Sequence, residues 1–216
     1  MQFEKWPGIP RLSKEKMIIT EKLDGTNACI VMQPAPHGVG DQELTDSGIV
    51  LGMPNENAPF GVELVEFAAQ SRSRFITPKD DNYGFAKWAY QNAEKLYAIL
   101  GYGKHYGEWW GSGIQRNYGL PEKRFSLFNA PRWNEQISYL FATTPVAELR
   151  TVPMLYNGPA DWSQVELWRE KLAQGSVAAP NFKGKAEGMV VYLRELNASY
   201  KVLIENDDIH KWEVKK

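Results

Sequence analysis

The chain has 216 residues, and its 25 lysines and arginines nearly balance its 26 aspartates and glutamates, which gives a net charge of −1. Hydrophobic residues make up 43% of the sequence, which excludes a disordered or low-complexity polymer. The single cysteine, Cys29, excludes an intrachain disulfide framework and a cysteine-based zinc site. The charge balance excludes a strongly basic protein, so any nucleic-acid binding has to depend on a local patch.

No apolar run approaches the roughly 18 residues of a membrane span. The first residues contain no apolar segment of the kind found in signal peptides. We therefore expect a cytoplasmic protein with no membrane partner.

Patterns of apolar residues predict strands along most of the chain. The first two, at 16–20 and 28–32, flank a turn built on Asp24 and Gly25. Residues 33–59 are expected to form a loop that contains a short strand at 48–52. The later predicted strands lie, in order, at 62–69, 105–110, 125–129, 146–155, 188–193 and 199–204.

Two helices are predicted among these strands. Residues 84–100 carry apolar side chains at helical spacing, and Gly101 is a natural stop. A second helix begins after Asp161, which is expected to cap it. Because strands outnumber helices and most neighbouring strands suit hairpins, the predicted class is α+β, with mostly antiparallel sheets and flanking helices.

The sharpest local motif is Lys22-Leu23-Asp24-Gly25. A lysine just before a tight turn projects from a fixed backbone, which suits a nucleophile better than a solvated lysine on a helix. The motif alone is a weak signal, because it arises by chance in roughly one chain in twenty of this size. The segments that follow it decide its meaning.

Four such segments follow Lys22 in a definite order. Glu108 ends a strand before a glycine-rich aromatic loop, and Phe128 lies on a later strand; Glu187-Gly188 and Lys201 come last. Together with Lys22, and in this order, these segments resemble motifs I, III, IIIa, IV and V of the covalent nucleotidyltransferases. This superfamily contains the ATP-dependent ligases and the capping enzymes. Residues 21–27 and 107–115 are most similar to the phage-type RNA ligase 2 family. The resemblance covers about residues 3–212.

This resemblance implies a nucleotidyltransferase fold, the ATP-grasp-like adenylation domain of ligases. It implies a single adenylyltransferase domain over residues 1–216, with no C-terminal accessory domain. The implied activity is ATP-dependent sealing of RNA 3′-hydroxyl and 5′-phosphate ends, through lysyl-N-AMP and an adenylylated RNA 5′ end. The implied cofactors are ATP and Mg²⁺ or Mn²⁺. RNA ends or a nicked RNA duplex are the implied partners, and a separate RNA-binding or end-healing protein is left open.

The resemblance also assigns roles to residues. Lys22 is the nucleophile, Glu187 helps to hold the metal, and Lys201 completes the catalytic set. An amine nucleophile needs neighbouring cations or partial burial to lose its proton, and Lys201 and a metal would supply the positive field. The residues implied to bind the nucleotide are Glu21, Asn27, Arg72, Arg74, Glu108, Phe128 and Lys201, with Glu108 on the ribose and Phe128 stacked on the adenine.

Some positions depart from the family pattern or stay ambiguous. Lys201 stands alone where the family usually has two lysines, and the candidates to compensate are Lys183, Lys185 and Lys211. Asn129 replaces a more usual aspartate. The Ser-Arg-Ser-Arg register leaves open which of Arg72 and Arg74 is the motif Ia arginine. The histidines, His37, His105 and His210, fit no catalytic or metal spacing and are expected to be structural or on the surface.

Three alternatives to RNA ligation stay open: a minimal ATP-dependent DNA ligase, a capping-type guanylyltransferase, and a non-catalytic RNA-binding relative. The first two usually carry a following oligonucleotide-binding domain, and only 216 − 201 = 15 residues follow Lys201. The RNA reading also predicts that the basic residues gather on the active-site face. These residues are Arg72, Arg74, Lys104, Arg116, Lys183, Lys185 and Lys201. Trp109 and Phe125, by contrast, are expected in the core.

Overall fold

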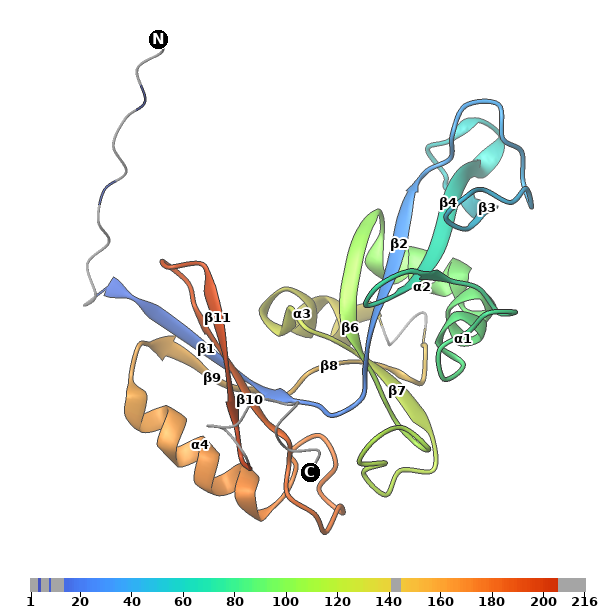
Figure 1. Ribbon diagram of the computed structural model, residues 1–216. Coiled ribbons are helices and arrows are strands. Elements are labelled where there is room, and N and C mark those ends of the chain that lie inside the picture. Colours follow the sequence, from blue (N-terminus) through green and yellow to red (C-terminus); the bar gives the residue numbers. More distant parts are fainter. Residues whose placement is uncertain (1–3, 5–7, 9–13, 141–144, 206–216) are drawn as a thin grey trace. The chain divides into compact units, whose positions relative to one another are not determined.

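The computed structural model describes residues 4, 8, 14–140 and 145–205 (Figure 1). The chain divides into two compact units. The first consists of Met1–Leu23 and Pro153–Lys216, and the second of Asp24–Val152. Each unit has its own sheet and its own hydrophobic core, and the chain passes from the first to the second directly after the Lys22-Leu23 dipeptide.

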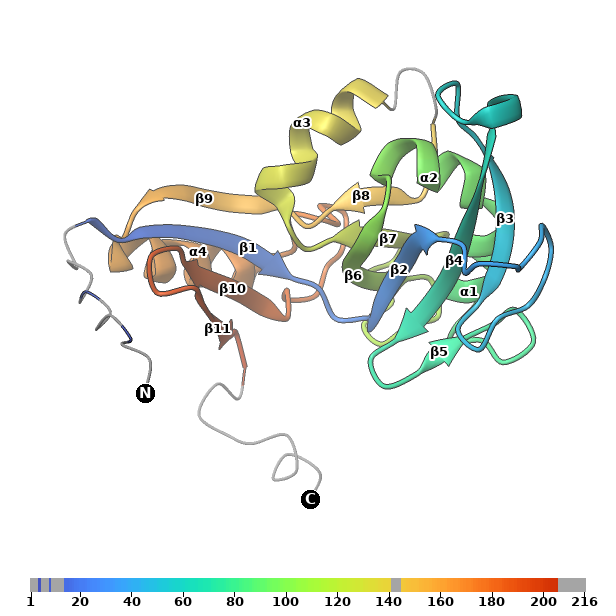
Figure 2. The same ribbon diagram turned by 90° about the horizontal axis from the view of Figure 1, so that it is seen from above.

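The sheet of the first unit has four antiparallel strands, in the order β11 (Ala198–Leu203), β10 (Gly188–Leu193), β1 (Lys16–Lys22) and β9 (Met154–Pro159). Helix α4 (Trp162–Gln174) lies along one face of this sheet (Figures 1 and 2). The core between them contains Met17, Ile19, Val165, Leu172, Met189 and Val191. Because side chains alternate along a strand, Thr20 and Lys22 lie on the face that α4 does not cover.

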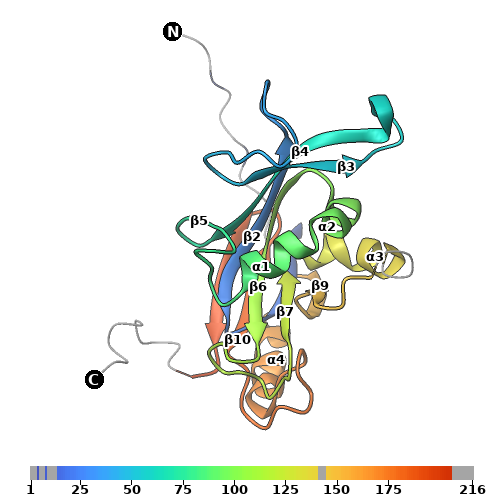
Figure 3. The ribbon, with the colours of Figure 1, turned by 90° about the vertical axis from the view of Figure 1, so that its right-hand side faces the viewer.

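The larger sheet belongs to the second unit. Its strand order is β3 (Ile49–Pro54), β4 (Val62–Ser71), β2 (Thr26–Pro34), β6 (Gly103–Gly111), β7 (Lys123–Leu127) and β8 (Leu149–Thr151), and β5 (Phe75–Ile76) pairs with β4. Its pairs are antiparallel except for β7 with β8. The helices of this unit, α1 (Phe85–Gln91), α2 (Ala93–Leu100) and α3 (Ala130–Leu140), pack on one face (Figure 3).

An aromatic cluster fills the core beneath α1. The ring centroids of Phe85, Trp88, Trp109 and Phe125 lie 5.0 to 5.8 Å from one another in the closest pairs. The two indole N–H groups are also satisfied, since Trp109 donates to the Tyr83 carbonyl at 3.1 Å and Trp88 to the Glu148 carboxylate at 3.1 Å. The predicted core positions of Trp109 and Phe125 are therefore confirmed.

The structure confirms the α+β class, with mostly antiparallel sheets and few helices. It also confirms the cap on α4, because Asp161 Oδ1 accepts a hydrogen bond from the Ser163 amide at 3.0 Å. Within the described part of the chain, no helix has the length and apolar character needed to cross a membrane.

Four details differ from the sequence expectation. Helix α3 (Ala130–Leu140) was not among the predicted helices. Strands β1 and β2 flank the turn at Asp24 and Gly25 but belong to different sheets, so they do not form a hairpin. The predicted helix at 84–100 is two helices that meet at Asn92, whose side chain bonds to the Trp88 carbonyl at 2.9 Å and competes with the backbone. The predicted strand at 146–155 is split into β8 and β9 at Pro153, which has no amide hydrogen to donate.

Candidate active site

In the first unit, Lys22 and Glu187 form a partly buried ion pair. Lys22 is the last residue of β1, and its register partner on β10 is Gly188, the residue after Glu187. Lys22 Nζ lies 2.7 Å from Glu187 Oε2, with side-chain exposures of 27% and 11%. The register requires glycine at 188, because a Cβ there would lie 2.2 Å from the Val202 carbonyl oxygen. The Glu-Gly sequence therefore allows β10 and β11 to approach closely beside the lysine.

Lys201 shares a sheet face with Lys22. Thr20 of β1 pairs with Val190 of β10, and Val190 pairs with Lys201 of β11. Because residues two apart on a strand face the same way, Lys22, Val190 and Lys201 all lie on the face away from α4. Val190 lies on the strand between the two lysines and was not predicted as a site residue. The alternation of β10, in which Met189 and Val191 are buried, could have placed Val190 on the same sheet face as the lysines.

Glu21 lies in a different environment from Lys22, the residue that follows it. It is almost fully buried, and its carboxylate accepts hydrogen bonds from Ser176 Oγ at 2.5 Å and from the Ala178 amide at 2.8 Å. Burial raises the pKa of this carboxyl, although these hydrogen bonds act in the opposite direction. The side chain thus anchors the loop that follows α4, and a direct contact of Glu21 with a nucleotide stays a prediction.

In the second unit, Glu108 and Asn27 form a hydrogen-bonded pair of polar side chains. They are register partners on β6 and β2, and Asn27 Nδ2 donates to Glu108 Oε2 at 3.3 Å. The other carboxylate oxygen accepts from the Gly25 amide at 3.1 Å. Gly25 itself is packed tightly, since a Cβ there would lie 2.4 Å from the Trp109 carbonyl oxygen. The structure therefore brings the motif III glutamate onto the turn that follows the motif I lysine.

Asp24, in the same turn, is held by the loop that follows β6. Its amide donates to Tyr118 Oη at 2.9 Å, and its carboxylate forms an ion pair with Arg116 Nε at 3.0 Å. Arg116 belongs to the predicted basic patch, and Tyr118 lies in the same loop.

Phe128 is partly exposed, and its stacking on an adenine stays a prediction. It directly follows β7, its side chain is 41% exposed, and its amide donates to the Tyr106 carbonyl at 3.0 Å. Phe125, three residues earlier, is fully buried. The ring of Phe128 is therefore accessible for stacking, while Phe125 belongs to the core.

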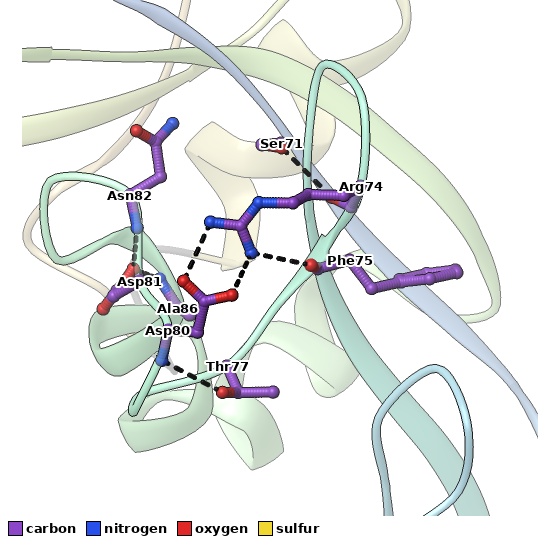
Figure 4. A network of polar contacts seen from close by, with 8 residues as sticks. All are labelled: Ser71, Arg74, Phe75, Thr77, Asp80, Asp81, Asn82 and Ala86. Atoms are coloured by element: carbon purple, nitrogen blue, oxygen red, sulfur yellow. Dashed lines mark hydrogen bonds and ion pairs between the residues drawn. The ribbon is translucent and has the colours of Figure 1, made fainter.

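The two candidate arginines after β4 have different surroundings. Arg74 forms a two-pronged ion pair with Asp80, with nitrogen–oxygen distances of 2.5 and 3.0 Å (Figure 4). Arg72 is exposed, and among the described residues it has no hydrogen bond or ion pair. Arg74 thus stabilises the β4–β5 turn, and Arg72 is the arginine with its guanidinium available for a phosphate.

The remaining basic residues are divided between the units. Arg72, Arg74, Lys104 and Arg116 belong to the second unit, and Lys183, Lys185 and Lys201 to the first. Lys104 lies four residues before Glu108 on β6, and Lys185 pairs with Glu205 at 2.9 Å. The gathering of all seven on one face stays a prediction, and Lys211 lies outside the described residues.

Two of the three histidines match the expectation of structural or surface roles. His37 is exposed, and His105 is buried with its Nε2 within 2.9 Å of the Gly101 carbonyl oxygen. His210 lies outside the described residues. In the ranges that the structure covers, no cluster of three or more His, Cys, Asp or Glu side chains could hold a metal ion.

The fold is that of the nucleotidyltransferase domain of ligases. The sequence matches the RNA ligase family model over residues 15–204, and the chain therefore belongs to the RNA ligase family. Among curated proteins no sequence matches significantly.

Solved structures of a Naegleria gruberi RNA ligase share this fold. A variant with AMP and Mn superposes with a TM-score of 0.56 at 18% identity, covering 89% of this chain and 50% of that one. An arginine-to-alanine variant with ATP and Mn gives a TM-score of 0.54 at 17% identity, covering 90% and 51%. At these identities the likeness concerns the fold, and this chain spans about half the length of those proteins.

Proposed function

We propose that the protein is an ATP-dependent RNA ligase that joins RNA 3′-hydroxyl and 5′-phosphate ends through AMP bound covalently to Lys22. The observation that carries this proposal is the Lys22–Glu187 pair, at the motif I and motif IV positions of a chain that belongs to the RNA ligase family. The nucleotides and Mn named for the Naegleria structures support ATP and a divalent metal as the cofactors.

Three transfers account for the reaction. The Lys22 amine attacks the α-phosphorus of ATP, a P–N bond forms, and pyrophosphate leaves. An oxygen of the RNA 5′-phosphate then takes the AMP from Lys22. The 3′-hydroxyl finally attacks that 5′-phosphate and AMP leaves, so the energy of one ATP is converted into one phosphodiester bond. The protein contributes mainly positioning and stabilisation of charge.

Lys22 has to attack as the free amine. Its Nζ lies 2.7 Å from Glu187 Oε2, so this ion pair has to separate as the P–N bond forms. Lys201, on the same sheet face, contributes positive charge that attracts the phosphates of ATP.

Glu187 is the residue that would hold a metal ion. A single carboxylate suits Mg²⁺ or Mn²⁺, because such ions keep several waters and also bind substrate phosphates. When bound, the ion supplies charge neutralisation at the phosphates. The ion pair with Lys22 supports this assignment, because it keeps the carboxylate beside the proposed nucleophile.

The second unit contributes side chains that are assigned to nucleotide binding. A carboxylate has about four acceptor sites, so Glu108 can keep its bonds to Gly25 and Asn27 and still accept from ribose hydroxyls. Phe128 offers an exposed ring for the adenine. Arg72 is assigned to the phosphates or the ribose because its guanidinium has no partner among the described residues.

RNA ends or a nicked RNA duplex are the proposed substrates, and a separate RNA-binding or end-healing protein is a proposed partner. The two units are proposed to act as one adenylyltransferase domain.

We also propose the cytoplasm as the location, since the one cysteine, Cys29, is buried and free, which suits a reducing compartment.

The proposal is tested with nucleotides labelled at the α-phosphate. The protein, freed of bound AMP, is incubated with Mg²⁺ or Mn²⁺ and labelled ATP or GTP, and then chased with nicked RNA or nicked DNA. We expect label from ATP, transfer of the label to RNA, and faster sealing of nicked RNA than of nicked DNA. Label from GTP alone would indicate a capping enzyme, faster DNA sealing a DNA ligase, and no label from folded protein a non-catalytic relative.

A further inference from the structure

The loop between β6 and β7 has an unusual backbone. Gln115, Asn117 and Tyr118 have φ angles of 45°, 60° and 50°, in the left-handed region that residues other than glycine rarely adopt. These three residues lie within four positions of one another. A conformation of this kind persists only where the surroundings determine it, and it is common at functional sites.

Local contacts hold the loop in this shape. Ile114 is fully buried in the core of the second unit, and the Gly113 amide donates to Asn117 Oδ1 at 2.8 Å. At the base of the loop, the Ser112 amide donates to the Glu122 carbonyl at 3.0 Å. The loop is therefore a fixed element that presents specific side chains.

Two of these side chains are directed at Asp24. The Tyr118 ring is 1% exposed and packs edge-on against Trp110, with centroids 4.9 Å apart. This packing fixes the phenol oxygen that accepts the Asp24 amide at 2.9 Å. Arg116 binds the Asp24 carboxylate at 3.0 Å, with both side chains less than a third exposed.

We propose that Tyr118 and Arg116 are positioning residues for the nucleophile, an inference that rests on the proposed ligase function. They fix the backbone and the side chain of Asp24, and Glu108 fixes the amide of Gly25. Lys22 precedes Asp24 by two residues, so these contacts, called the Asp24 clamp, fix the point at which the chain enters the second unit directly after the nucleophile.

The three transfers depend differently on such a clamp. Lysyl-AMP formation uses the Lys22 amine as its nucleophile, whereas sealing of RNA that already carries a 5′-AMP forms no bond to Lys22. A positioning role therefore predicts a selective loss in the first step. A general loss of folding or of the nucleotide pocket would reduce both steps.

The test compares Tyr118→Phe, Arg116→Ala and Arg116→Lys with the wild-type chain. Tyr83→Phe is the matched control, since it also removes one phenol oxygen, and no hydrogen bond of that oxygen is found among the described residues. We expect Tyr118→Phe and Arg116→Ala to slow lysyl-AMP formation at saturating ATP by about tenfold or more, with the KM for ATP nearly unchanged. Sealing of pre-adenylylated nicked RNA should change by less than about threefold, and Arg116→Lys should recover part of the first-step rate.

A second readout needs no activity. The Asp24 amide loses its acceptor in Tyr118→Phe, so its hydrogen exchange in the folded protein should become faster, while Tyr83→Phe leaves it unchanged. Equal losses in both chemical steps, or an unchanged Asp24 exchange rate, would overturn the clamp while leaving the ligase function intact. A wild-type chain that neither takes AMP nor seals pre-adenylylated RNA would overturn the proposed function, and the positioning role with it.

Discussion

Lys22 Nζ and Glu187 Oε2 lie 2.7 Å apart at the end of β1, so the proposed nucleophile and the proposed metal-binding carboxylate neutralise each other in the first unit. The pair explains how a lysine with a partly exposed side chain is held in one direction. Several consequences of the structure can be measured.

Glu187→Gln should reduce lysyl-AMP formation by roughly a hundredfold or more, since it removes the carboxylate charge while keeping the shape of the side chain. The dependence on Mn²⁺ concentration should shift to higher concentrations, because the amide is a poorer ligand. Glu166→Gln, the same change at an exposed position on α4, is the control. Labelling with ATP over a series of Mn²⁺ concentrations measures both effects, and a wild-type profile from Glu187→Gln would contradict the assignment.

The two arginines after β4 should separate in their effects. Arg72→Ala should lower the rate of AMP transfer by about tenfold or more with no change in stability, because its guanidinium contacts no described residue. Arg74→Ala should instead loosen the β4–β5 turn, at a cost of about 0.2–1 kcal/mol, since its ion pair with Asp80 is largely exposed. Urea unfolding and single-turnover labelling distinguish the two. The reverse pattern would assign motif Ia to Arg74.

Gly25→Ala should destabilise the protein by about 1–3 kcal/mol, because the added methyl group would lie 2.4 Å from the Trp109 carbonyl oxygen and 2.7 Å from Trp110 Cβ. Neither neighbour is the free end of a flexible side chain. Gly175→Ala, where a Cβ meets no atom within 4 Å, is the control. Thermal unfolding measures the difference, and equal melting temperatures for the two variants would show that the turn does not pack against β6 as described.

His105 should make the protein less stable in acid. Burial lowers the pKa of His105 below its ordinary value of 6.5, so the folded state resists a proton that the unfolded state accepts. The contribution of the neutral ring to the free energy of unfolding is complete above pH 6.5 and is lost as the pH falls through the folded-state pKa. Glu21, whose pKa is raised by burial, acts in the opposite direction. The free energy of unfolding should therefore decline less between about pH 7.5 and 5.5 in His105→Gln than in the wild type; parallel curves would refute the effect.

The sequence predicted those features that depend on local patterns. The bounds of β10, the cap at Asp161 and the burial of Phe125 follow from alternation, a capping residue and an aromatic between apolar neighbours. The order of motifs also predicted that Lys22 and Glu187 belong to one site, and the register of β1 with β10 places them side by side.

What the sequence could not predict depends on distant partners or on rare backbone conformations. Whether β1 pairs with β2 or with β10 is decided by sheet partners more than 150 residues apart, and no local pattern contains that information. The contact between Tyr118 and Asp24 could not be predicted, because the left-handed backbone of Gln115, Asn117 and Tyr118 leaves no signal in the amino-acid composition. Arg72 and Arg74 became distinguishable only when the position of Asp80 was known.

The most direct test of the account is to locate the covalent AMP. After incubation with ATP and Mg²⁺, the protein is digested and the modified peptide is identified by mass spectrometry, with Lys22→Ala and Lys16→Ala, a lysine on the same strand and face, analysed in parallel. The account predicts AMP on Lys22 in the wild type and in Lys16→Ala, and none in Lys22→Ala. AMP on another residue, or its persistence in Lys22→Ala, would contradict it.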